Sequence, residues 1–275
     1  YAHAVLRLRP DIRTLHMPML ADSMYLAAMR ESLGTNVWLP DATDVQNAVR
    51  TYAQKIRTDE RMPRRIDLPS DRMRIAGLTA LLDITASIMR QIWHHNARPV
   101  LYEESLEVTN LYQSLAPAGP LFTFDKEAAA APASTNMLML TATWTAYLEL
   151  LDRMPLDPAW HAARRLLARC AGAQAAFLYA QNYTNTAEFL FGVALRLSPG
   201  EPDPYLRWAR ILLQREKYGQ AVKTLSLYLE HNPSNETVHA FARECATNMQ
   251  RHAQIAALEY ERQRHPLGIS NTMLL

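Results

Sequence analysis

The last third of this chain repeats itself with a period of 34 residues. Ala187 and Ala221 are 34 positions apart, and so are Pro199 and Pro233. Each copy has a small residue, a large apolar residue four positions later and a proline after the helical pattern ends. A fainter third copy ends at Pro266, one residue short of this register. The period predicts a unit of two helices that stacks on its copies and buries a shared core.

This period resembles that of the tetratricopeptide repeat. The first helix of that repeat has large, large, small and large residues at fixed positions, which are occupied here by Tyr205, Trp208, Ala209 and Leu212. Tyr218 marks the turn into the second helix. The resemblance implies a helical array over about residues 170–266 that binds a protein or peptide partner.

The repeat pattern divides the side chains into a core and an exposed face. We expect these residues to be buried between paired helices: Ala187, Phe191, Ala194, Ala209, Ala221 and Leu225. Tyr205, Trp208 and Leu212 should pack inward, whereas the expected partner contacts are Arg207, Arg210 and Gln214. Two arginines three positions apart suit an acidic or carboxylate-bearing ligand. The alternative is a pair of solvated surface arginines.

The first 126 residues alternate strand-like and helical patterns. The strand-like runs are residues 13–17, 36–39, 72–75, 99–103 and 120–124, and the helical runs are 24–32, 41 onward and 78–96. Such alternation predicts an α/β domain with a mainly parallel sheet flanked by helices. Residues 127–135 are small residues with one proline and predict a linker. Residues 136–275 then read as all helix, so the expected fold class is α/β followed by all-α.

Two candidate ligand sites fall at the carboxyl edge of this expected sheet, where open α/β sheets bind ligands. Asp22 and Tyr25 lie at a strand end and helix start, and the alternative is that Asp22 only caps the helix. Glu103 and Glu104 follow a later strand. Because neighbouring strand residues point to opposite faces, solvated edge charges are the alternative to a carboxylate pair.

Composition and spacing argue against several other functions. The chain has 275 residues, 49% of them hydrophobic, and a net charge of +2 without a basic tract, so it predicts a folded protein that does not bind nucleic acid. Neither the neighbouring His94 and His95 nor the distant Cys170 and Cys245 have metal-ligand spacing. We therefore expect no metal site, no cofactor and no catalytic residue in this chain.

The N-terminal segment resembles a known family in its order of motifs. Residues 9–13 (Arg-Pro-Asp-Ile-Arg), 19–26, 36–40, 98–105 and 115–121 are similar to the soluble region of bacterial membrane proteins related to protein O-mannosyltransferases. That resemblance implies an extracytoplasmic, periplasmic region that recognises a partner or a glycan acceptor. Catalysis, and contact with a membrane, would belong to a preceding part of a longer protein.

Two alternatives stay open. The chain is cytoplasmic if it is a free-standing adaptor that binds a peptide through its repeats. It is an enzyme of its own if the sheet edge near Asp22 and Glu103 carries chemistry. The sequence does not decide whether the chain, which begins at Tyr1, is a fragment or a complete protein.

Overall fold

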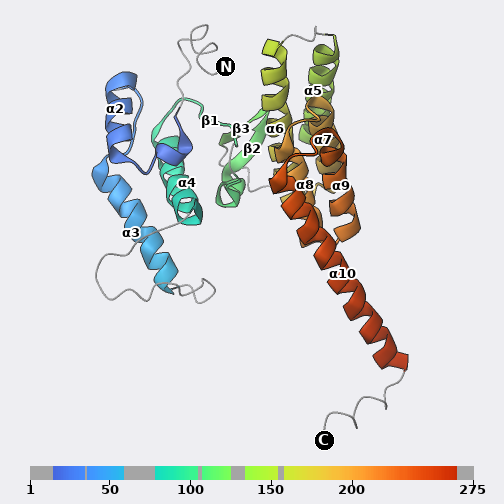
Figure 1. Ribbon diagram of the computed structural model, residues 1–275. Helices are drawn as coiled ribbons and strands as arrows, with labels where there is room; N and C mark the ends of the chain where they lie inside the picture. Colours follow the sequence, from blue (N-terminus) through green and yellow to red (C-terminus); the bar gives the residue numbers. More distant parts are fainter. Residues whose placement is uncertain are drawn as a thin grey trace, which may run out of the picture. The chain divides into compact units, whose positions relative to one another are not determined.

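The computed structural model describes residues 15–34, 36–58, 78–104, 107–124, 134–153 and 158–264. The chain divides into two compact units, Tyr1–Asn136 and Met137–Leu275. The described residues of both units are mostly helical, and a small sheet lies in the first (Figure 1).

In the first unit, α4 packs against α3 and against two 3-10 turns. In chain order, the described elements of this unit are the 3-10 turn η1 (Met17–Met19), α2 (Ser23–Leu33), α3 (Ala42–Thr58), α4 (Leu78–His95), β1 (Leu101–Tyr102), the 3-10 turn η2 (Thr109–Ser114), β2 (Leu115–Ala118) and β3 (Leu121–Phe124). The predicted helices 24–32, 41 onward and 78–96 are confirmed as α2, α3 and α4. Fully buried side chains include Leu26, Ile88, Leu111 and Phe122.

The predicted parallel sheet is wrong. The three described strands have the order β1–β3–β2, and both pairings are antiparallel. β2 and β3 form a tight hairpin across Gly119, whose φ of 60° is readily adopted only without a Cβ. The runs 99–103 and 120–124 do contain strands. The sequence does not predict β2, because Pro117 and the two alanines beside it are not typical strand residues.

Two predicted strands do not form, one for a local reason and one because of a distant contact. Residues 17–19 form η1, with Pro18 at the start of the turn. Residues 36–39 form no strand because Asn96 occupies the backbone that a neighbouring strand would use. The Trp38 N–H donates to Asn96 Oδ1, and Asn96 Nδ2 donates to the Trp38 carbonyl, both at 2.9 Å. The predicted strand 72–75 and residues 13–14 lie outside the described residues.

The second unit is an array of antiparallel helix pairs. Its helices are α5 (Ser134–Asp152), α6 (Pro158–Ala180), α7 (Thr184–Leu197), α8 (Pro202–Gln214), α9 (Tyr218–His231) and α10 (Glu236–Arg264). α6 packs on α7, α8 on α9 and α9 on α10. The starts of α7 and α9 are 34 residues apart, and so are those of α8 and α10. A Cβ at Gly172 would lie 3.3 Å from Pro204, so the small residue permits close contact between α6 and α8.

The helix-pair turns repeat in detail. Asn182 and Glu216, again 34 positions apart, have φ of 66° and 59°. The next N–H in each turn, from Tyr183 or Lys217, donates to a carbonyl five residues earlier, at 2.9 Å. This is the bonding pattern of a helix end closed by a left-handed residue. One backbone solution therefore serves both repeats, although neither turn contains the usual glycine.

The faint third copy does not form a helix pair within the described chain. α10 runs unbroken for 29 residues and extends beyond the other helices of the array (Figure 1). The positions equivalent to Ala221 and Leu225 are Ile255 and Glu259, so the small and apolar residues that would seal a third pair are missing. Pro266 lies outside the described residues.

Candidate binding surface of the helical repeats

The predicted repeat core is confirmed. All six residues assigned to it are buried, and Tyr205 and Leu212 are buried beside them. Trp208 is half-buried and stacks on Phe191 with ring centroids 4.6 Å apart, while the Tyr179 ring meets it edge-on at 5.5 Å. These contacts join α6, α7 and α8 into one packed layer.

The expectation that Arg207 is exposed is wrong. Arg207 is only 3% exposed, and its Nε lies 2.9 Å from Oδ2 of Asp203, which is one helical turn earlier on α8. A buried guanidinium needs such a counter-charge, because desolvating an unpaired cation is costly. Arg207 therefore does not form an exposed pair with Arg210.

Arg210 and Gln214 are both exposed on α8, four positions apart and hence on one helical face. Arg215 lies at the end of the same helix, and its guanidinium carbon is 5.1 Å from the centre of the Tyr179 ring. This arrangement supplies hydrogen-bond donors on the first helix of the second repeat. Contact with a partner at Arg210 and Gln214 stays a prediction.

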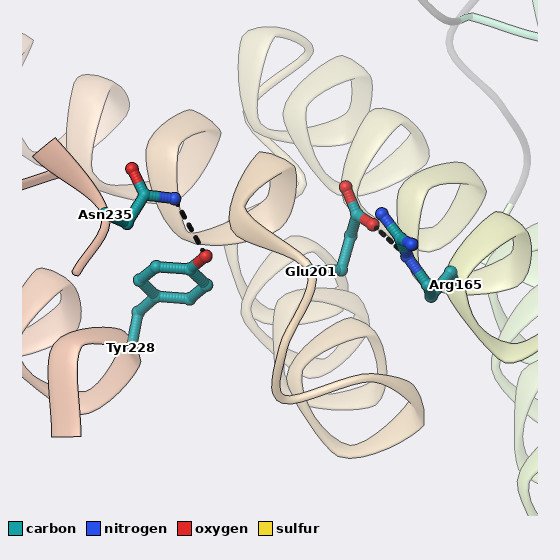
Figure 2. A network of polar contacts seen from close by, with 4 residues as sticks. All are labelled: Arg165, Glu201, Tyr228 and Asn235. Carbon is teal, nitrogen blue, oxygen red and sulfur yellow. Dashed lines mark hydrogen bonds and ion pairs between the residues drawn. The ribbon is translucent and has the colours of Figure 1, made fainter. Parts of the chain in front are cut away.

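Two polar contacts fix the entries to α8 and α10 (Figure 2). The buried Glu201 carboxylate accepts from Arg165 Nε at 2.9 Å, and Asn235 Nδ2 donates to the Tyr228 hydroxyl at 2.9 Å. Asn235 Oδ1 also accepts from the Val238 N–H and so caps α10. Glu201 and Asn235 are 34 positions apart, a signal that could have revealed both from the sequence.

Asp22 and Tyr25 serve local structure. Asp22 Oδ1 accepts from the backbone N–H groups of Met24, at 2.8 Å, and Tyr25, at 3.3 Å, which caps α2. The Tyr25 hydroxyl accepts from the His16 N–H at 2.9 Å. The expected ligand site requires the carboxyl edge of a parallel sheet, which the described strands do not form. Ligand binding at these two residues is untested.

Glu103 and Glu104 follow β1 and have different environments. Glu104 is buried and accepts from the Tyr112 hydroxyl at 3.3 Å, whereas Glu103 is half-buried. The hydrogen bond gives Glu104 a role in holding η2 near the sheet. A ligand role for either carboxylate stays a prediction.

Histidine and cysteine side chains are dispersed. His95 stacks on Trp38 with ring centroids 4.1 Å apart. Cys170 and Cys245 are buried free thiols, and burial raises the pKa of Cys245. The described residues contain no group of three or more His, Cys, Asp or Glu that could hold a metal ion. None of the described helices is both long and apolar enough to cross a membrane.

The geometry defines a helical-repeat array of the kind that presents a contact surface. Comparison with known families agrees: residues 178–245 match the model of the tetratricopeptide repeat. This segment runs from the end of α6 to the middle of α10 and contains both repeated turns. No curated protein and no solved structure matches the chain.

Proposed function

We propose that this chain is a binding module that holds a protein or peptide partner on its helical repeats. The observation that carries the proposal is the repetition, after 34 residues, of the helix starts and turns and of most buried positions of α7 in α9, over the segment that matches the tetratricopeptide repeat. Tetratricopeptide repeats commonly bind protein or peptide partners. An adaptor role agrees better with these findings than a role in a membrane glycosyltransferase.

The first helices of the repeats are the proposed contact surface. Arg210 and Gln214 project from α8, and both side chains are long enough to reach a partner backbone or carboxylate. Arg207 has a structural role instead. Its side chain is buried and pairs with Asp203 within α8, so it does not reach a partner. The proposed recognition therefore uses one exposed arginine and one amide, with Arg207 as their support.

A crosslinking experiment tests this surface. A photoreactive residue replaces Gln214 on α8 or, as a control, the exposed Lys223 on α9. Crosslinked proteins are identified by mass spectrometry, and the purified partner is titrated against the chain. We expect crosslinking from position 214 and an affinity loss of about tenfold for Arg210→Glu, but not for Lys223→Glu, as for one charged hydrogen bond. Equal crosslinking at both positions contradicts the proposal.

A finer proposal comes from the N-terminal resemblance alone. It makes the chain the extracytoplasmic region of a membrane glycosyltransferase-like protein, on the periplasmic side, with recognition of a partner or glycan acceptor and no catalysis of its own. The reading frame upstream of Tyr1 tests the parent, because several hydrophobic spans are required there. Incubation with polyprenyl-phosphate sugars tests the chemistry. Transfer that is lost when Asp22 or Glu103 is replaced would make this chain an enzyme.

A further inference from the structure

Helix α5 is apolar on two opposite faces, of which the described structure covers one. Its inner face contributes Met137, Leu140, Trp144, Leu148 and Leu151 to the core. Trp144 Nε1 donates to Gln174 Oε1 on α6 at 2.8 Å, which fixes this face against the array. The inner face of α5 is therefore buried within the second unit.

The outer face exposes large apolar side chains. Leu138 is 73%, Met139 65% and Leu150 50% exposed, and the exposed Ala142 and Ala146 lie between them. Leu138, Ala142, Ala146 and Leu150 are spaced by four and form one row along the helix. Residues 134–148 contain no charged residue.

A helix at the edge of an array normally presents polar side chains to water. The first half of α10 follows this rule, since its exposed residues include Arg243, Glu244 and Thr247, whereas its second half also exposes Ile255 and Leu258. The exposed residues of α5 are mainly apolar instead, and the exceptions are Thr145, Glu149 and Asp152. An exposed apolar surface of this kind marks an interaction site.

We propose that this face binds the same face of a second copy of the chain, with the two α5 helices antiparallel. The row is self-complementary, as a two-fold interface requires. When the axis passes near residue 144, Leu138 of one copy lies beside Leu150 of the other, and Ala142 beside Ala146. The alanines at the centre let the two helices approach closely, while the leucines fill the space at the ends.

The charges select the antiparallel arrangement. The acidic residues of α5, Glu149 and Asp152, are in its last turn, and its first turn has none. Asp152 is already paired with Arg196 at 2.6 Å, and Arg153 follows it. An antiparallel partner places Glu149 opposite Met139, in the half of the other helix that contains no charged residue. A parallel partner would place Glu149 beside its own copy, where like charges repel.

One helix pair buries little surface compared with stable dimers, so the expected association is micromolar. Analytical ultracentrifugation of the full chain over micromolar concentrations measures it. We expect a monomer–dimer equilibrium, and a dissociation constant at least about tenfold weaker for Ala142→Arg and Ala146→Arg, because each buries a charge. The matched control is Ala256→Arg, an exposed alanine of α10, which should leave the equilibrium unchanged. Circular dichroism confirms that all variants are folded.

Disulfide trapping tests the orientation. A mixture of Leu138→Cys and Leu150→Cys chains should crosslink faster than either variant alone. Faster crosslinking of Leu138→Cys with itself overturns the antiparallel pairing. A monomer at every concentration, or an Ala142→Arg variant that dimerises as the wild type does, overturns the interface. If the protein is monomeric and Ala142→Arg lowers its stability, another part of the same chain covers the outer face of α5. That result also overturns the proposal.

Discussion

The two units differ in how their helices begin. In the first unit, acidic side chains cap two helices: Asp22 caps α2, and Asp41 accepts hydrogen bonds from the N–H groups of Thr43 and Asp44 at the start of α3. In the repeats, α7, α8 and α9 begin without a side-chain cap. Their starts are set by repeated turns and by packing on neighbouring helices. Local caps therefore define the starts of α2 and α3, whereas the 34-residue register defines those of α7, α8 and α9; α10 combines the register with a cap at Asn235.

A matched pair of core substitutions gives the largest expected effects. Phe122 in the sheet and Phe191 in the repeats are each 1% exposed. Phe122→Ala and Phe191→Ala should each lower the free energy of unfolding by about 3–5 kcal/mol, because each leaves a cavity. Denaturant unfolding measures the loss, and hydrogen exchange shows where it occurs. If Phe122→Ala deprotects α7–α9 as much as α4, the units do not behave as separate cores.

Overpacking tests the dependence of the repeats on small residues. Ala209 has no exposed surface, so Ala209→Phe should cost about 1–3 kcal/mol of unfolding free energy. Ala240 is exposed on α10, and the same substitution there should change stability by no more than about 0.5 kcal/mol. Thermal unfolding compares the two variants. Equal melting temperatures would contradict the close packing of α8.

Removal of a cap tests the first unit. Asp22→Ala should cost about 1 kcal/mol, because two N–H groups at the start of α2 lose their acceptor. Asp22→Asn keeps an acceptor oxygen and should retain most of the stability. Urea denaturation separates these outcomes. An asparagine variant as unstable as the alanine variant would argue for a role of the charge beyond capping.

The smallest expected effect is the acid sensitivity contributed by Asp41. The hydrogen bond from the Asp44 N–H is the main cause that lowers the pKa of Asp41; burial opposes it, and the Thr43 N–H and the Arg30 charge support it. Because the pKa is lower in the folded state, this stabilisation is present above the unfolded value of about 3.9 and is lost as the pH falls through the folded value. Asp41→Asn should flatten the stability profile in that acidic range. An unchanged profile would contradict the assigned shift.

The fold was predictable where interactions are local or repeated. The helices α2, α3 and α4 follow from their apolar patterns, and α2 and α3 follow also from caps within a few residues. The antiparallel sheet did not follow, because strand pairing depends on distant partners and a short run such as β2 has a weak pattern. Of the proposed contacts, the exposure of Arg210 and Gln214 followed from the helical period. The burial of Arg207 did not.

By itself, the sequence determined the 34-residue register, the buried alanines of the repeats and the cap at Asp22, because each is encoded by residues close in the chain or by repetition. Other features depend on the tertiary structure. The backbone of Trp38, where a strand is expected, is hydrogen-bonded to the side chain of Asn96, 58 positions away. Arg165 likewise pairs with Glu201, which is 36 positions away. Contacts of this kind depend on which surfaces meet after the helices have packed. No single segment of the sequence contains that information.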